Sequence, residues 1–210
     1  MKTFASACLA VLLLTLPAAV LAAPKKGGKP KAPPPVRVLL QTEKGDIELE
    51  LDEAHAPKTV RNFLGYVDAG LYDGGVFHRT VTPDNQPNNP VKIEVIQAGV
   101  DPARQSEEKA PIPLERTKDT GLKHVDGAIS MARDTPDTAT GDFFICVGAQ
   151  PELDFGGKRN PDGQGFAAFG RVVKGMDVVR AIQQAPHSEQ KLTPPVRILK
   201  ATRQPAPTKG

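Results

Sequence analysis

The first clear pattern of apolar and polar residues that indicates secondary structure lies at residues 36–51. Residues 36–40 (VRVLL) are mainly apolar, and residues 46–51 (DIELEL) alternate strictly with a period of two. A period of two is typical of a strand with one buried and one wet face. The intervening Glu43-Lys44-Gly45 is typical of a turn, so the two segments predict a β-hairpin.

Two segments follow a helical period instead. The first has Pro57 in its first turn and Gly70 at its end, which are preferred positions for these residues. The second, residues 176–183, places Val179 and Ile182 one turn apart. The first segment carries a single apolar stripe at spacings of three and four residues, made of Val60, Phe63, Leu64 and Val67.

Short strand candidates separated by turns fill most of the remaining chain. Glycine (19) and proline (21) are frequent, which favours many turns over a helical bundle. No regular alternation of strands and helices is present, which disfavours a parallel α/β sheet. The pattern therefore predicts a mainly β fold, a closed and mainly antiparallel barrel capped by two helices. The candidates are residues 75–81, 91–98, 128–132, 143–147, 166–173 and 196–201.

The first 22 residues have the features of a secretory signal peptide. Lys2 is the single charge, an apolar run covers residues 7–16, and Ala22 offers a cleavage point. A membrane anchor is the alternative, but the apolar run is too short to span about 30 Å of hydrocarbon. We therefore expect an exported protein, in the periplasm or secreted, without stable membrane insertion.

The signal peptide is followed by a basic, proline-rich segment, residues 23–35, which we interpret as a flexible linker. We expect the globular domain at residues 36–202 and a disordered tail at 203–210. Removal of the signal peptide takes away Lys2 and Cys8, and leaves a net charge of +2 instead of +3. This balance gives no reason to expect a nucleic-acid partner. The remaining Cys146 lies in an apolar run and is predicted to be buried.

Common catalytic motifs are absent from the sequence. It has no phosphate-binding loop with a Gly-Lys-Ser/Thr ending, and no Gly-x-Ser-x-Gly elbow for a nucleophile. The four histidines are not spaced as metal ligands, so we expect no metal and no cofactor. A secreted β-barrel with a hydrolytic site is therefore disfavoured, because the sequence shows neither a nucleophile motif nor a set of metal ligands. What remains is binding, or a reaction that needs neither nucleophile nor cofactor.

Three segments together form a specific pattern: residues 72–79 (YDGGVFHR), residues 127–133 (GAISMAR) running on to 141–146 (GDFFIC), and residues 166–172 (FAAFGRV). In this order and at this spacing they resemble the cyclophilin family of peptidyl-prolyl cis-trans isomerases. The resemblance covers about residues 36–201. It implies an eight-stranded antiparallel barrel with a helix at each end, and rotation about Xaa-Pro bonds without a cofactor.

The resemblance also implies the site residues. Arg79, Gln97 and Phe144 match the catalytic arginine, the catalytic glutamine and the phenylalanine of the proline pocket. Met131, Ala132 and Leu153 match the pocket rim and wall. The other expected substrate-binding residues are His78, Val95, Arg133, Asp142 and Phe166.

The sequence departs from the family pattern around the expected pocket. Residues 80–91 form an insertion, which either shapes access to the site or is a neutral surface loop. Glu94 and Val95 replace the family's usual phenylalanine and methionine, which predicts a smaller apolar pocket. Glu152 replaces its tryptophan. Asp142 and Arg133 either pair across the groove or each meet a substrate group of opposite charge.

Two functions from different classes remain open at this point. The first is an active prolyl isomerase, a monomer in the periplasm that acts on proline-containing polypeptide clients. The second is a cyclophilin-like module that binds proline segments with little turnover. Retention of Arg79, Gln97 and Phe144 favours the first, and Glu94, Val95 and Glu152 leave room for the second.

Overall fold

The computed structural model describes residues 35–205. The predicted signal peptide, nearly all of the predicted linker and residues 206–210 lie outside this range. Within the described residues, no helix is long and apolar enough to cross a membrane.

The predicted N-terminal hairpin is present. Strands β1 (Val36–Thr42) and β2 (Gly45–Leu51) pair antiparallel, with Val36 opposite Leu51 and Thr42 opposite Gly45. Gly45 closes the turn at a φ of 125°, a backbone conformation that residues other than glycine rarely adopt. Its tight turn sets the register that turns the apolar residues of both strands to the interior.

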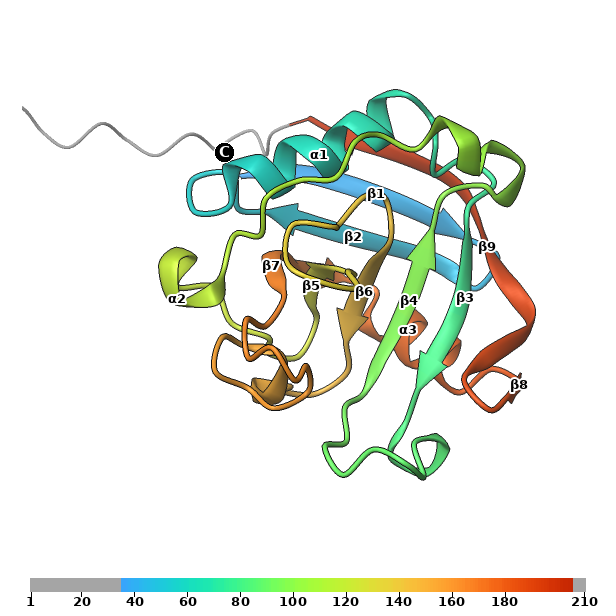
Figure 1. Ribbon diagram of the computed structural model, residues 1–210. Helices are drawn as coiled ribbons and strands as arrows, with labels where there is room; N and C mark the ends of the chain where they lie inside the picture. Colours follow the sequence, from blue (N-terminus) through green and yellow to red (C-terminus); the bar gives the residue numbers. More distant parts are fainter. Residues whose placement is uncertain (1–34, 206–210) are drawn as a thin grey trace, which may run out of the picture. The chain divides into compact units, whose positions relative to one another are not determined.

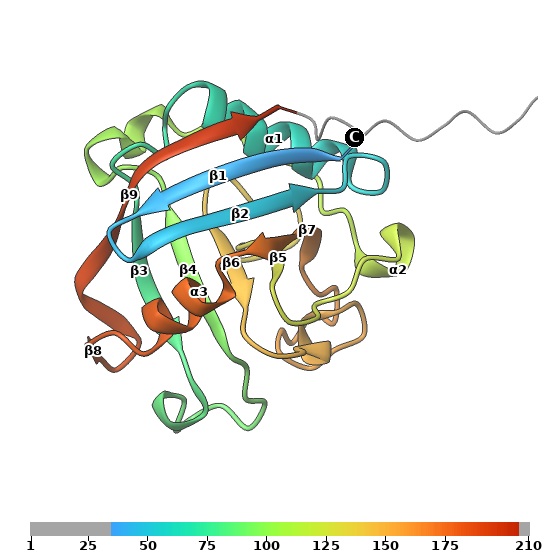
Figure 2. The same ribbon diagram turned by 180° about the vertical axis from the view of Figure 1, so that it is seen from behind.

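Eight strands close into an antiparallel barrel, as predicted. The ring runs β1-β2-β7-β5-β6-β4-β3-β9, and β9 pairs again with β1. The two-residue β8 adds a small hairpin to β9 outside this ring. Figures 1 and 2 show the ring from its two sides. The other strands are β3 (Val76–Val81), β4 (Val95–Gly99), β5 (Ala128–Met131), β6 (Phe143–Cys146), β7 (Ala167–Lys174), β8 (His187–Ser188) and β9 (Lys191–Gln204).

Two main helices pack against the barrel, at the positions the periodicity predicts. The helix α1 (Pro57–Asp68) buries Val60, Phe63, Leu64 and Val67 and contacts β9 and β7. The helix α3 (Met176–Gln183) buries Val179 and Ile182 and contacts β2, β3 and β4. A single-turn helix, α2 (Thr117–Thr120), lies in a connection, and 3₁₀ turns cover Pro83–Asn85, Pro102–Glu107 and Pro151–Leu153.

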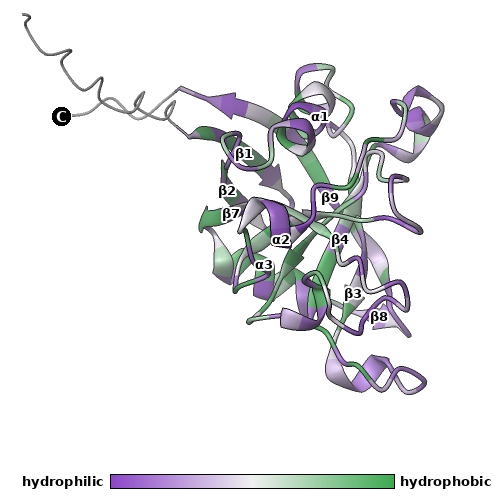
Figure 3. Cartoon of the chain, turned by 60° about the vertical axis from the view of Figure 1, so that its left-hand side comes forward, coloured by the Kyte–Doolittle hydropathy of each residue, from purple (hydrophilic) through white to green (hydrophobic). Residues whose placement is uncertain are grey.

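The apolar residues form two separate clusters. The larger fills the barrel and includes Phe143 and Ile145, whereas the smaller includes Phe144 and Cys146. Successive strand residues point to opposite faces, so β6 supplies both clusters from one apolar run. Figure 3 shows hydrophobic residues interspersed with hydrophilic ones along the barrel strands, and mostly hydrophilic residues along the loops. Cys146 is buried as predicted, and burial raises the pKa of its thiol.

Two predicted boundaries differ from the structure. The strand β9 extends to Gln204, so the predicted tail at 203 begins two residues too early. Arg203 and Gln204 pair with Val38 and Arg37 of β1. Backbone pairing along this edge is satisfied whatever the polarity of the side chains, and polarity alone therefore misplaced the domain end. The strand expected at 91–98 is β4, Val95–Gly99, preceded by irregular chain.

Candidate active site

A row of side chains crosses three neighbouring strands on the outer face of the barrel. Arg79 of β3 pairs with Gln97 of β4, which pairs with Phe144 of β6. Directly opposite residues in antiparallel strands have their Cβ atoms about 4.5–5.5 Å apart and share a face of the sheet. Strand register thus brings these three residues together, although Arg79 and Phe144 are 65 positions apart in the sequence.

A cavity of about 520 Å³ opens over this row. Arg79, Gln97 and Phe144 all line it. The predicted substrate-binding residues that also line it are Val95, Ala132, Arg133, Asp142, Leu153 and Phe166. The structure therefore brings nine of the predicted site residues to one cavity.

The floor of the cavity is apolar. The ring of Phe144 meets that of Phe166 edge-to-face, with centroids 5.3 Å apart. Leu153 and Val95 pack in the same cluster. A recess lined by apolar side chains suits an apolar ring such as that of proline.

Ile93 is a further member of this floor, which the sequence analysis missed. It lines the cavity and is 6% exposed. Glu94 points elsewhere, since its carboxylate accepts a hydrogen bond of 3.0 Å from Nε2 of Gln183 on α3. Ile93 thus restores apolar area that Glu94 removes. The period of two from Val95 back to Ile93 was the signal that could have found it.

The guanidinium of Arg79 is held from two sides by neutral amides. Its Nη1 donates to Oε1 of Gln97 at 2.9 Å. Its Nε and Nη2 donate to Oε1 of Gln190 at 2.9 and 2.6 Å. Burial lowers the pKa of Arg79, yet an arginine remains charged at neutral pH. Gln190 was missed because it lies 111 residues away, in the turn between β8 and β9.

A polar chain continues from Gln97 toward the opposite side of the cavity. Nε2 of Gln97 donates to Oδ2 of Asp142 at 3.0 Å. His78 lies 3.6 Å from the same carboxylate through its Nε2, but does not line the cavity. His78 is the bulged residue of β3, where the register shifts between Phe77 and Arg79. The structure thus places His78 beside Asp142 but not among the residues that line the cavity.

Arg133 and Asp142 do not pair across the groove. Arg133 donates to both carboxylate oxygens of Asp162, at 2.8 and 3.0 Å, and to the carbonyl of Gly165. Its side chain is 1% exposed and its guanidinium lies 5.0 Å from the ring centre of Phe166. Of the two alternatives for these residues, pairing across the groove is therefore wrong, because the 156–165 segment supplies the nearer carboxylate. Arg133 supports the Phe166 wall and is already neutralised.

Met131 is not part of the cavity, contrary to expectation. It is 1% exposed and belongs to the large interior cluster. Its partner across β6 is Phe143, whereas Ser130 is opposite Phe144. The alternation of β5 therefore turns Met131 inward, and Ala132 alone represents this pair at the rim.

A Ser-His-Asp arrangement lies behind the pocket wall. Nδ1 of His124 is 2.8 Å from Oδ1 of Asp154, and its Nε2 is 3.0 Å from Oγ of Ser130. The His124 ring stacks on Phe144 with centroids 5.9 Å apart. Ser130 is 0% exposed, so a substrate cannot reach its hydroxyl. The arrangement supports Phe144 from behind and is not a hydrolytic site.

Comparisons with known proteins agree with this architecture. Residues 37–203 match the family model for "Cyclophilin type peptidyl-prolyl cis-trans isomerase/CLD". The chain is 40% identical over 147 residues to peptidyl-prolyl cis-trans isomerase cyp18 of Streptomyces antibioticus, covering 70% of this chain and 82% of that protein. It is 38% identical over 148 residues to peptidyl-prolyl cis-trans isomerase A of Dickeya dadantii, covering 70% of each. A crystal structure of a cyclophilin type isomerase from Cryptosporidium parvum shares the fold, with a TM-score of 0.66 at 22% identity over 82% of this chain and 99% of that chain.

These matches and the barrel define an enzyme of the peptidyl-prolyl cis-trans isomerase class, EC 5.2.1.8. The family model spans nearly all of the described residues and includes the whole Arg79–Gln97–Phe144 row. The chain belongs to the cyclophilin family.

Proposed function

We propose that Arg79 catalyses rotation about Xaa-Pro bonds while Phe144 and its neighbours hold the prolyl ring. The bond resists rotation by about 18–20 kcal/mol because the amide nitrogen shares its lone pair with the carbonyl. A hydrogen bond donated to the prolyl nitrogen favours the twisted state, in which the lone pair is localised on nitrogen. No nucleophile or cofactor is needed for this chemistry.

The single observation that supports this role is the unused donor capacity of Arg79. A guanidinium has five N–H groups. Three hydrogen bonds to Gln97 and Gln190 orient it within the described residues, which leaves two N–H groups for a substrate. Both orienting partners are neutral amides, so the positive charge is not cancelled. A preorganised, partly buried charge of this kind stabilises a transition state more than a mobile one does.

Phe144, Phe166, Leu153, Val95 and Ile93 supply the recess for the prolyl ring. With the ring fixed there, the chain preceding the proline is free to swing. Gln97 has a second role, because its amide links Arg79 to Asp142 and keeps the guanidinium beside the recess.

The test is substitution of Arg79 in the full chain. We expect Arg79→Ala to lower kcat/KM in a protease-coupled assay on a proline tetrapeptide by about 100-fold, as for loss of one preorganised donor. Arg79→Lys is also expected to be impaired, because an ammonium cannot reproduce the planar fork. Arg171→Ala is the control, since this arginine is 64% exposed on β7 and pairs with Glu50.

Thermal unfolding of each variant separates lost chemistry from lost structure. Wild-type turnover by a normally stable Arg79→Ala variant would overturn the role of this arginine. A wild-type chain that binds proline peptides without raising the rate above background would instead support a binding module.

We also propose that the clients are exported proteins and that the enzyme acts in the periplasm. The support is the sequence alone: one basic residue, the apolar run of residues 7–16 and the small residues ending at Ala22. Mass spectrometry of the protein from a cell-envelope fraction is expected to give an N-terminus near Ala23. An intact Met1 on that protein, or confinement of the protein to the cytoplasm, would contradict the proposal.

A further inference from the structure

Two segments that extend the barrel meet beside the active site. One is the connection from β3 to β4, residues 82–94, and the other is the glycine-rich segment at residues 156–165. Arg159 of the second reaches across to the first, where its Nη1 donates to Oε1 of Gln86 at 2.8 Å and to the carbonyl of Val91 at 2.7 Å. The cavity is therefore lined by a third guanidinium besides those of Arg79 and Arg133.

Arg159 has no carboxylate partner within residues 35–205. Its hydrogen bonds go to neutral oxygens only, and none of the ion pairs among these residues includes it. Arg133, in the same cavity, is the opposite case, since its guanidinium is paired with the carboxylate of Asp162 and also donates to the carbonyl of Gly165. Arg159 consequently keeps its positive charge available to a ligand.

The geometry of its hydrogen bonds also leaves the useful edge of Arg159 open. Both N–H groups of Nη1 are directed to Gln86 and Val91, while Nε and Nη2 have no partner among the described residues. Nε and Nη2 together form a two-donor fork that matches the two oxygens of a carboxylate. Nε and Nη2 of Arg159 are accessible to solvent. Among the described residues, the buried side-chain nitrogens and oxygens without a hydrogen-bond partner do not include any atom of Arg159.

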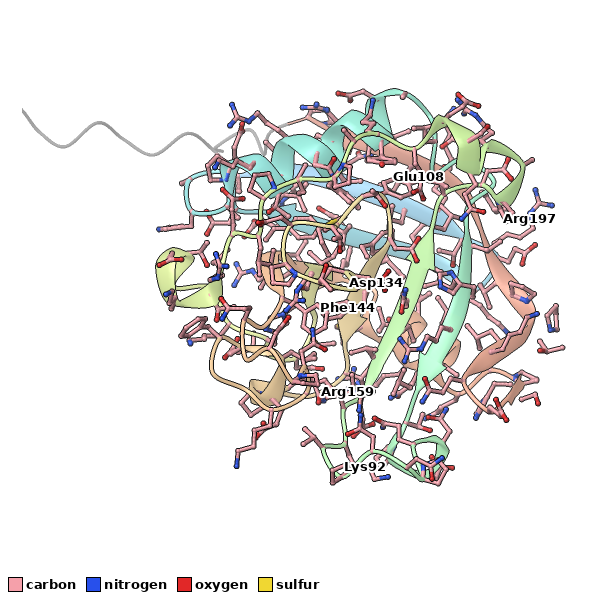
Figure 4. The ribbon with its side chains drawn as sticks, in the orientation of Figure 1. Lys92, Glu108, Asp134, Phe144, Arg159 and Arg197 are labelled. Atoms are coloured by element: carbon pink, nitrogen blue, oxygen red, sulfur yellow. The ribbon has the colours of Figure 1, made fainter. Side chains whose placement is uncertain are left out.

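Arg159 stands where two cavities adjoin. It lines the active-site cavity, and it lines a neighbouring cavity of about 770 Å³ between residues 84–89 and the β8–β9 hairpin, which carries His187 and Gln190. A polypeptide with its proline over Phe144 has to extend beyond the recess, and the neighbouring cavity offers it a path past Arg159. In the view of Figure 4, Arg159 and Asp134 lie on opposite sides of Phe144, so the two ends of the site differ in charge.

We propose that Arg159 is a specificity-determining residue that binds a carboxylate of the client chain close to the prolyl residue. The proposal rests on the isomerase site described above and deepens it, because it names the substrate class as acidic proline segments. Arg79 and Arg159, the two arginines of this cavity without a carboxylate partner among the described residues, repel each other, and a client carboxylate offsets that repulsion. Burial and the charge of Arg79 both lower the pKa of Arg159, in agreement with this mutual repulsion.

The test uses peptides blocked at both ends and NMR exchange between their cis and trans signals, which needs no protease. Each pair has Glu or its neutral isostere Gln at one position before or after an Ala-Pro unit. For the wild-type full chain, we expect the Glu peptide to be isomerised about three- to fivefold more efficiently at one or more of these positions. High salt is expected to reduce the difference, because screening weakens a partly exposed ion pair. A neutral peptide with a free terminal carboxylate distinguishes a chain end from an acidic side chain.

Variants assign the effect to Arg159. In Arg159→Gln the Glu and Gln peptides are expected to be isomerised equally, whereas Arg159→Lys keeps part of the preference. Arg180→Gln, on the exposed side of α3 and paired with Asp126, is the matched control and is expected to keep the preference.

Equal rates for the two wild-type peptide series, or a preference that survives in Arg159→Gln, would overturn the proposal. A uniform loss for all peptides in Arg159→Gln, with a lower Tm, would overturn it as well, because it would show that Arg159 only holds the two segments together. Failure of the wild type to isomerise even the neutral peptide would instead overturn the catalytic proposal, and this one with it.

Discussion

Gln190 is expected to determine how well Arg79 works, although it contacts no catalytic atom other than those of the guanidinium. Its Oε1 accepts from both Nε and Nη2 of Arg79, and its Nε2 donates to the carbonyl of Asn85 at 3.1 Å. The bond to Asn85 fixes the amide orientation that presents oxygen to Arg79. Gln190→Ala removes both hydrogen bonds and leaves Gln97 as the single orienting partner.

The magnitude follows from the freedom that Arg79 regains. An arginine side chain carries about 2 kcal/mol of rotamer entropy, part of which Gln97 still restrains. A loss of about 1–2 kcal/mol in transition-state stabilisation corresponds to a fall in kcat/KM of about 5- to 30-fold. Gln190→Glu is expected to be impaired too, because a carboxylate in this place would pair with Arg79 and cancel part of its charge.

The assay is the protease-coupled isomerisation of a proline tetrapeptide, with Tm measured for every variant. Gln184→Ala, an exposed glutamine at the end of α3, is the matched control and should behave as the wild type. Wild-type efficiency in Gln190→Ala would refute the reasoning. So would full activity in Gln190→Glu, since the argument requires a neutral partner for the guanidinium.

Three further predictions concern the support of the site. Ser130→Ala should lower the free energy of unfolding by about 1–3 kcal/mol, because it leaves Nε2 of the buried His124 without a hydrogen-bond partner. Chemical denaturation measures this change, and an unchanged midpoint would count against it. The hydrogen bond from Arg133 is the largest cause that lowers the pKa of Asp162 from its ordinary value of 3.8; burial opposes it, and the Gln164 N–H and the charges of Arg133 and Arg116 add to the lowering. Ionisation of Asp162 therefore contributes stability that is complete above pH 3.8 and is lost as the pH falls through the lower folded-state value. The difference in unfolding free energy between wild type and Asp162→Asn should shrink in that acid range, and a pH-independent difference would contradict this. Cys146 should resist a bulky thiol reagent without denaturant, since it is fully buried and burial raises the pKa of its thiol; rapid labelling would show otherwise.

Much of the fold could be predicted because its strands and helices follow from the local periodicity of apolar residues. The alternation of residues 46–51 predicted β2, and the stripe from Val60 to Val67 predicted α1. The helix at residues 176–183 has the bounds of α3. The motif around Arg79, with those around Gln97 and Phe144, predicted a common site, and the structure places all three in one row. Each of these inferences depends on residues within a few positions of one another, or on a family pattern that already contains the distant pairing.

Other features became visible only when distant segments were brought together. Residue type suggested that Met131 lines the pocket, but strand register turned it inward with Phe143. Arg133 forms an ion pair with Asp162, 29 residues away, and Arg79 donates hydrogen bonds to Gln190 at a separation of 111 residues. Neither partner lies in a periodic element, so no local pattern pointed to it.

Local periodicity was thus enough to predict the barrel and its two main helices, and the family resemblance pointed to the central arginine, glutamine and phenylalanine. The groups that orient this arginine, the neutralisation of Arg133 and the position of Arg159 become visible only in the folded chain. Apolar periodicity is a property of one strand or helix, whereas hydrogen-bond partners and the neutralisation of a charge depend on which loops meet after the barrel has closed.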